Sequence, residues 1–155
     1  MTPDDLYNAL QISPDLLSAG QPTAEQLRAL AAAGYHTVIN LATPASENHL
    51  PDEAALLAEL GLRYVSIPVV WTDPRPEDFA RFEGVMAGLA PGPVLLHCAA
   101  NFRATAFYAL YAERHLGWTT AQGESFRTQI WQGYQEPAWE AFLASMRAQT
   151  PPPGA

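Results

Sequence analysis

The residue types best suited to chemistry lie together in one short segment, around the single cysteine of the chain. The segment reads Val94-Leu95-Leu96-His97-Cys98-Ala99-Ala100-Asn101-Phe102-Arg103-Ala104-Thr105. Its apolar start predicts a strand that ends at His97, and Arg103 opens a predicted helix, so a four-residue loop follows Cys98. Backbone N–H groups at a helix N-terminus attract anions and favour the nucleophilic thiolate form of cysteine. Arg103 adds a planar, permanent charge that suits phosphate.

The alternative interpretation is an inert cysteine buried behind an apolar strand, which is the commoner role of a lone cysteine. The flanking His97 and Arg103 favour the reactive site. His97 is expected to hydrogen-bond the backbone around the loop and to hold Cys98 in place. The loop has no glycine, so Asn101 is the natural residue to adopt a positive φ and turn the N–H groups inward. An ordinary turn would also explain this asparagine.

Length and composition limit the classes of function. A chain of 155 residues suits a single domain, predicted over 1–149, with a disordered, proline-rich tail over 150–155. The net charge of −8 argues against nucleic acid and anionic membranes as partners. The scattered histidines predict no metal site and no cofactor. One cysteine cannot form an internal disulfide, and the N-terminus does not resemble a secretory signal, so a cytoplasmic location is expected.

Strand and helix patterns alternate along most of the chain. Strands are predicted at 16–20, 35–41, 62–68 and 94–97, and helices at 23–33, 51–60, 76–89, 103–115, 120–132 and 137–148. This order predicts an α/β domain with a mostly parallel central sheet of about four to five strands, flanked by helices. Parallel strands end at the same edge of a sheet, so Cys98 and the loops after Leu41 and Pro68 are expected to meet there.

Five segments carry a resemblance to a known family. They are 18–23, 34–41, 50–53, 64–69 and 97–103. With these segments, the chain resembles the protein tyrosine and dual-specificity phosphatase superfamily, in particular small bacterial phosphatase-like proteins, over about residues 16–139. The resemblance implies the cysteine phosphatase fold and hydrolysis of phosphate monoesters through a phosphocysteine, with phosphotyrosine or another aryl phosphate favoured. It implies a phosphorylated small molecule or phosphoprotein as partner, and a phosphate or sulfate ion in the loop.

The same resemblance assigns roles to particular residues. Cys98 becomes the nucleophile, Arg103 the phosphate-binding cation, and Asp73 the general acid. The phosphate-binding loop comprises Ala99, Ala100, Asn101, Phe102, Arg103 and Ala104. His97 and Thr105 support the site, and Trp71 and Phe102 either wall the pocket or pack in the core.

Three features depart from the family pattern. The family has five residues between cysteine and arginine where this chain has four, which narrows the arc of N–H donors. Ala104 stands where the family has a hydroxyl that assists the departing thiolate, a donor worth about one to two orders of magnitude in rate. The nearest hydroxyl is that of Thr105. Val70 stands where the acid falls in some variants, which leaves Asp73 as the nearest carboxylate for a step worth about 10²–10⁴-fold.

These departures leave two alternatives open. A four-residue loop is similar to the active loop of rhodanese-type sulfurtransferases, which cradles a smaller persulfide sulfur, so a thiol enzyme of that kind is the first. The second is a phosphate-binding or anion-binding module without turnover. The sequence pattern that spans most of the chain favours the phosphatase.

Overall fold

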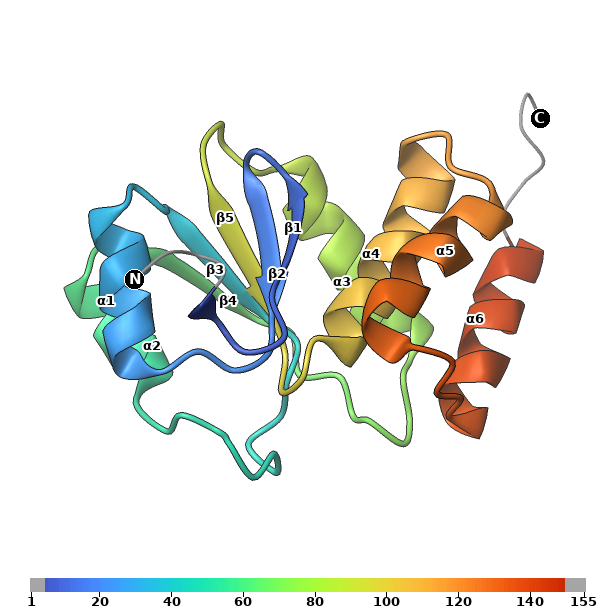
Figure 1. Ribbon diagram of the computed structural model, residues 1–155, viewed down its shortest axis with the longest axis horizontal. Helices are drawn as coiled ribbons and strands as arrows, with labels where there is room; N and C mark the ends of the chain where they lie inside the picture. The colour runs from blue at the N-terminus through green and yellow to red at the C-terminus, as the bar shows by residue number, and fades with distance from the viewer. Residues whose placement is uncertain (1–4, 150–155) are drawn as a thin grey trace.

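The computed structural model describes residues 5–149, in which a five-stranded sheet separates two groups of helices (Figure 1). The strands are β1 Leu10–Ser13, β2 Leu16–Ala19, β3 Thr37–Asn40, β4 Arg63–Ser66 and β5 Val94–His97. Their order across the sheet is β1-β2-β5-β3-β4. The sheet is parallel except for β1, which pairs antiparallel with β2. The predicted α/β class and mostly parallel sheet are confirmed.

The central strand β5 carries the cysteine segment to the edge of the sheet where the parallel strands end. In register, His97 of β5 lies opposite Ala19 of β2 and Asn40 of β3. All four residues of β5 are buried, so Cys98 follows a strand that is paired on both sides and covered on both faces. Such a strand is a rigid base for a functional loop.

The edge strand β1 is not among the strands that the sequence pattern predicts. It is four residues long, and its side chains alternate between half-buried and exposed. Pro14 and Asp15 form the turn that joins it to β2. A short edge strand gains its stability from pairing with a neighbour, and its own pattern is too brief to predict it.

The helices begin and end close to their predicted bounds. They are α1 Ala24–Ala32, α2 Glu53–Glu59, α3 Pro76–Ala87, α4 Phe102–His115, α5 Thr120–Trp131 and α6 Pro137–Gln149. Thr23 and Gln26 form the expected capping box of α1, in which each side chain bonds the backbone N–H of the other residue. Gly34 ends this region with a φ of 95°, a conformation that glycine adopts without strain.

Two hydrophobic clusters cover the two faces of the sheet. Helices α1 and α2 pack on one face with aliphatic side chains such as Leu27 and Leu57, which meet Leu95 of β5. Helices α3 to α6 pack on the other face around an aromatic cluster that includes Phe107 and Trp139. Within residues 5–149, none of the helices is both long and apolar enough to cross a membrane. The predicted tail over 150–155 lies outside the described residues.

Candidate active site

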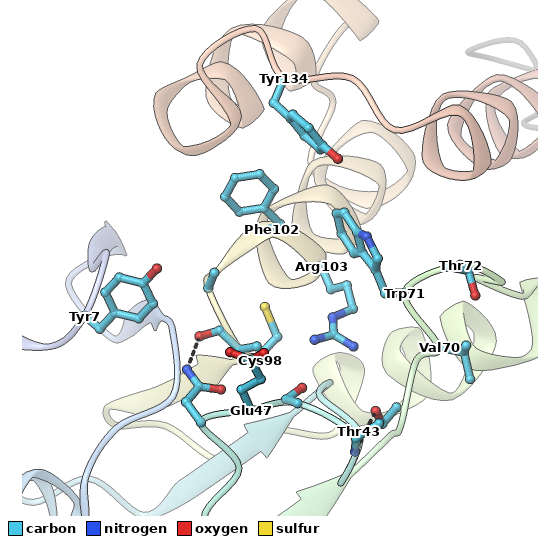
Figure 2. A pocket seen from close by; sticks show the side chains of 15 residues that line it. Tyr7, Thr43, Glu47, Val70, Trp71, Thr72, Cys98, Phe102, Arg103 and Tyr134 are labelled. Carbon is cyan, nitrogen blue, oxygen red and sulfur yellow. Dashed lines mark hydrogen bonds between the residues drawn. The ribbon is translucent and has the colours of Figure 1, made fainter.

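A cavity of about 890 Å³ opens where the parallel strands end, and Cys98 lies at its base (Figure 2). Its walls come from the N-terminal segment, the loop after β3, the loop after β4, the cysteine loop and the turn after α5. The lining residues are Tyr7, Thr43, Ala45, Ser46, Glu47, Asn48, Val70, Trp71, Thr72, Cys98, Ala99, Ala100, Phe102, Arg103 and Tyr134. The prediction that Cys98 meets the loops after Leu41 and Pro68 is confirmed.

Backbone and side-chain hydrogen bonds hold the cysteine loop in place. The backbone N–H of Cys98 donates to the carbonyl of Ala19, with N and O 3.3 Å apart. The carbonyl of Ala99 accepts from the backbone N–H of Gln21 at 3.0 Å and from the Asn48 side chain at 2.9 Å. A Cβ on Gly20 would lie 2.7 Å from the same carbonyl oxygen, so glycine permits this close approach. The end of β2 and the loop after β3 therefore fix the cysteine loop.

Asn101 turns the loop into helix α4. Its φ is 72°, in the left-handed region, as predicted for the residue that replaces glycine here. Its side chain is fully buried and donates to the carbonyl of Asn8 at 2.9 Å and to Ser18 Oγ at 3.1 Å. Asparagine thus supplies both the unusual backbone angle and two anchoring hydrogen bonds.

The loop presents backbone donors that the protein itself does not use. Within residues 5–149, no hydrogen bond uses the backbone N–H of Ala99, Ala100, Phe102 or Arg103. The last two belong to the first turn of α4, where the helix dipole adds positive potential. Unused N–H groups beside Cys98 form a concavity suited to an anion.

The guanidinium of Arg103 is positioned beside the cysteine with most of its donors unoccupied. Its Nη1 donates to the carbonyl of Val69 at 2.8 Å, and the side chain is 6% exposed. The guanidinium carbon lies 6.0 Å from the ring centre of Trp71. In the described part of the chain the other N–H groups of the Arg103 guanidinium make no hydrogen bond. They remain available to donate to an oxyanion.

His97 bonds the backbone of Cys98, as predicted, and also joins a buried carboxylate that the sequence did not reveal. Its Nδ1 lies 3.1 Å from the carbonyl oxygen of Cys98, and its Nε2 lies 2.7 Å from Glu53 Oε2. Gln21 donates to the other oxygen of Glu53 at 2.6 Å. Burial alone would raise the pKa of Glu53, but the hydrogen bonds from His97 and Gln21 and the His97 charge hold it below 4.5.

Replacing Glu53 with glutamine is expected to lower the free energy of unfolding by about 3 kcal/mol at neutral pH, because the substitution removes one partner of the buried His97–Glu53 pair. The pKa of Glu53 is lower in the folded than in the unfolded chain. The ionised Glu53 carboxylate therefore contributes its full share of the free energy of unfolding above about pH 4.5. This contribution is lost as the pH falls through the pKa that Glu53 has in the folded chain. Urea unfolding at several pH values tests this.

Glu59→Gln is the matched control for that experiment, because Glu59 is exposed at the far end of the same helix. Its effect is expected to stay within about 0.5 kcal/mol. A gap between wild type and Glu53→Gln that stayed constant down to pH 3 would contradict the ionised pair.

The structure does not bring Asp73 to the cavity. Its side chain is exposed and forms an ion pair with Arg75, in which Asp73 Oδ2 lies 2.8 Å from Arg75 Nη2. Its backbone N–H bonds the carbonyl of Val70 in a tight turn, so residues 70–72 line the cavity and Asp73 does not. Its role as general acid remains a prediction, and the geometry gives it no support.

Three other predicted site residues lie behind the cavity wall. The Thr105 hydroxyl donates to the carbonyls of Asn101 and Phe102, at 2.8 and 3.1 Å, inside the first turns of α4. Ala104, like Asn101, is fully buried, and none of the three lines the cavity. Ala99, Ala100, Phe102 and Arg103 do line it, as expected for the phosphate-binding loop.

Aromatic side chains surround the opening, and some of them were absent from the sequence-based prediction. Trp71 and Phe102 wall the pocket, with ring centres 6.1 Å apart. Trp139 fixes Trp71 through a 2.7 Å hydrogen bond from its Nε1 to the Trp71 carbonyl. Tyr7 and Tyr134 complete the rim and are 56% and 50% exposed. They lie far from Cys98 in the sequence, so no local pattern could identify them.

Residues 5–139 match the family model described as "DSP-PTPase phosphatase fused to NAD+ Kinase". The fold matches a crystal structure from Shewanella putrefaciens, described as a candidate phosphatase (DUF442). The TM-score is 0.83 with 34% identity, over 96% of this chain and 94% of that one.

A "Beta-lactamase hydrolase-like protein" of Agrobacterium fabrum is 32% identical over 105 residues, and the match covers 66% of this chain but only 24% of that protein. The fold also matches that of Pseudomonas aeruginosa TpbA, crystallised in complex with phosphotyrosine. The TM-score is 0.68 and the identity 20%, over 97% of this chain and 93% of that one.

Proposed function

Because the chain belongs to the family of phosphatase domains described as DSP-PTPase, we propose that it is a cysteine-dependent phosphatase that hydrolyses phosphate monoesters. The observation that carries this proposal is the arrangement around Cys98: unused backbone N–H groups on one side and the unoccupied fork of Arg103 on the other. Together they suit the three peripheral oxygens of a phosphoryl group, whose negative charge is spread in the transition state.

The proposed reaction has two steps. The Cys98 thiolate attacks phosphorus, an S–P bond forms, the P–O bond to the leaving group breaks, and the leaving oxygen takes up a proton. Water then attacks the phosphocysteine, the S–P bond breaks, and phosphate and the thiolate are released. Arg103 and the loop N–H groups hold the phosphoryl oxygens through both steps. No metal or cofactor is invoked.

The cavity favours a substrate with one phosphate on an aryl group. Among the described residues that line it, Arg103 is the only cation, so a second phosphate would find no guanidinium partner. The aromatic rim offers faces on which a phenyl or tyrosyl ring stacks. Three of the exposed large hydrophobic side chains, Tyr7, Val70 and Tyr134, lie at this opening. A phosphotyrosyl protein or a small aryl phosphate is the proposed partner, and the cytoplasm the proposed location.

Intact-mass measurement of the protein, quenched in acid during turnover of 4-nitrophenyl phosphate, tests the covalent mechanism. A mass increase of one phosphoryl group, located on Cys98 by peptide mapping, is expected because the loop stabilises the phosphocysteine. Phosphate binding without turnover or labelling would instead support an anion-binding module. Formation of a Cys98 persulfide with thiosulfate, without phosphoryl labelling, would support a sulfurtransferase.

A further inference from the structure

The cavity contains one carboxylate, that of Glu47, among the described residues that line it. Glu47 lies in the loop after β3, and Figure 2 draws it beneath Cys98, with the Arg103 guanidinium to the right of the cysteine. Its side chain makes no hydrogen bond or ion pair within residues 5–149. A carboxyl group that lines the cavity and has no partner among the described residues is available for proton transfer.

The loop that carries Glu47 is fixed to the cysteine loop by its neighbour. The Asn48 side chain donates to the carbonyl of Ala99, the residue after Cys98, at 2.9 Å. A compact turn shapes the rest of the loop, because the backbone N–H of Ser46 bonds the carbonyl of Thr43 at 3.2 Å. The loop that carries Glu47 is therefore held against the cysteine loop, and the exposed Glu47 side chain lines the cavity from there.

The proposed phosphatase reaction needs an acid at this place. When the S–P bond forms and the P–O bond breaks, the leaving oxygen acquires negative charge and requires a proton. The sequence-based choice for that role, Asp73, is bound to Arg75 and lies outside the cavity. Val70, from the loop after β4, also lines the cavity, but its aliphatic side chain cannot supply a proton.

We propose that Glu47 is the general acid of this site, an inference that rests on the proposed phosphatase activity. Its carboxylic acid gives a proton to the leaving oxygen as the P–O bond breaks. The resulting carboxylate takes a proton from the water that attacks the phosphocysteine, which restores the acid when the thiolate departs. The acid thus comes from the loop after β3, whereas the loop after β4 contributes the apolar wall formed by Val70 and Trp71.

Leaving-group dependence tests the assignment. The kcat/KM of wild type and Glu47→Gln is measured with phenyl phosphate, whose leaving group needs a proton, and with 4-nitrophenyl phosphate, whose leaving group departs as an anion. Glu47→Gln is expected to lose about 10²-fold or more on phenyl phosphate and much less on 4-nitrophenyl phosphate. Glu47→Asp should recover part of the loss. Asn48→Ala should show the same selectivity more weakly, because Asn48 positions the loop.

Two variants separate this role from its rivals. Glu59→Gln removes an exposed carboxylate remote from the cavity and should leave both rates unchanged. Equal losses of Glu47→Gln on both substrates, or a selective loss in Asp73→Asn instead, would overturn the assignment while the phosphatase activity stands. Absence of any Cys98-dependent hydrolysis by wild type would overturn both the assignment of Glu47 and the proposed phosphatase activity. Circular dichroism confirms that each variant is folded before its rate is compared.

Discussion

Replacement of Cys98 with serine is expected to reduce the hydrolysis of 4-nitrophenyl phosphate by about 10⁴-fold or more, because removal of a nucleophile disables the remaining groups that act with it. The substitution exchanges sulfur for oxygen at the base of the cavity and leaves the loop N–H groups and Arg103 in place. The variant should therefore still bind inorganic phosphate. Steady-state kinetics and isothermal titration calorimetry measure the two effects separately.

This pairing of lost turnover with retained binding distinguishes the nucleophile from a structural cysteine. Cys98 is 1% exposed and also packs against the hydrophobic core, so a defect in folding would lower both activity and phosphate affinity. Thr105→Ser provides a conservative control in the same segment, because its hydroxyl bonds backbone carbonyls behind the cavity. Equal rates for wild type and Cys98→Ser would exclude covalent catalysis.

Replacement of Arg103 with lysine is expected to lower kcat/KM by about 10²- to 10³-fold, as for other groups that stabilise charge in a transition state. Lysine keeps the positive charge but loses the planar fork. Arg103 Nη1 donates to the carbonyl of Val69, and the other guanidinium nitrogens have no hydrogen-bond partner among the described residues. One ammonium group cannot match both the carbonyl and two phosphoryl oxygens.

The loss in Arg103→Lys should appear in kcat as well as in phosphate inhibition, because the fork contacts the phosphoryl group in the ground state and in the transition state. Competition by inorganic phosphate measures binding in the ground state, and single-turnover rates measure stabilisation of the transition state. Arg28→Lys, on the exposed face of α1, is the matched control and should behave as wild type. A kcat/KM for Arg103→Lys equal to that of wild type would show that the cavity binds phosphate without this side chain.

Local sequence determined much of the fold. Capping residues such as Thr23 with Gln26, and the glycine after α1, mark boundaries because their effects act within one helical turn. The apolar run before His97 identified β5 with its observed bounds. Its place as the central strand followed from pairing and not from composition. The edge strand β1 escaped prediction because its stability depends on β2.

The features of the candidate site also separate into those set by neighbouring residues in the sequence and those set by tertiary contacts. The sequence by itself determined the cysteine segment: the place of Cys98 after a buried strand, the arginine that follows it, and the positive φ of Asn101, since these depend on residues a few positions apart. The tertiary structure alone decided which distant side chains join them. It brought Glu53 under His97 and Glu47 into the cavity, and it left Asp73 outside, because the meeting of loops at a sheet edge depends on strand order rather than on local spacing.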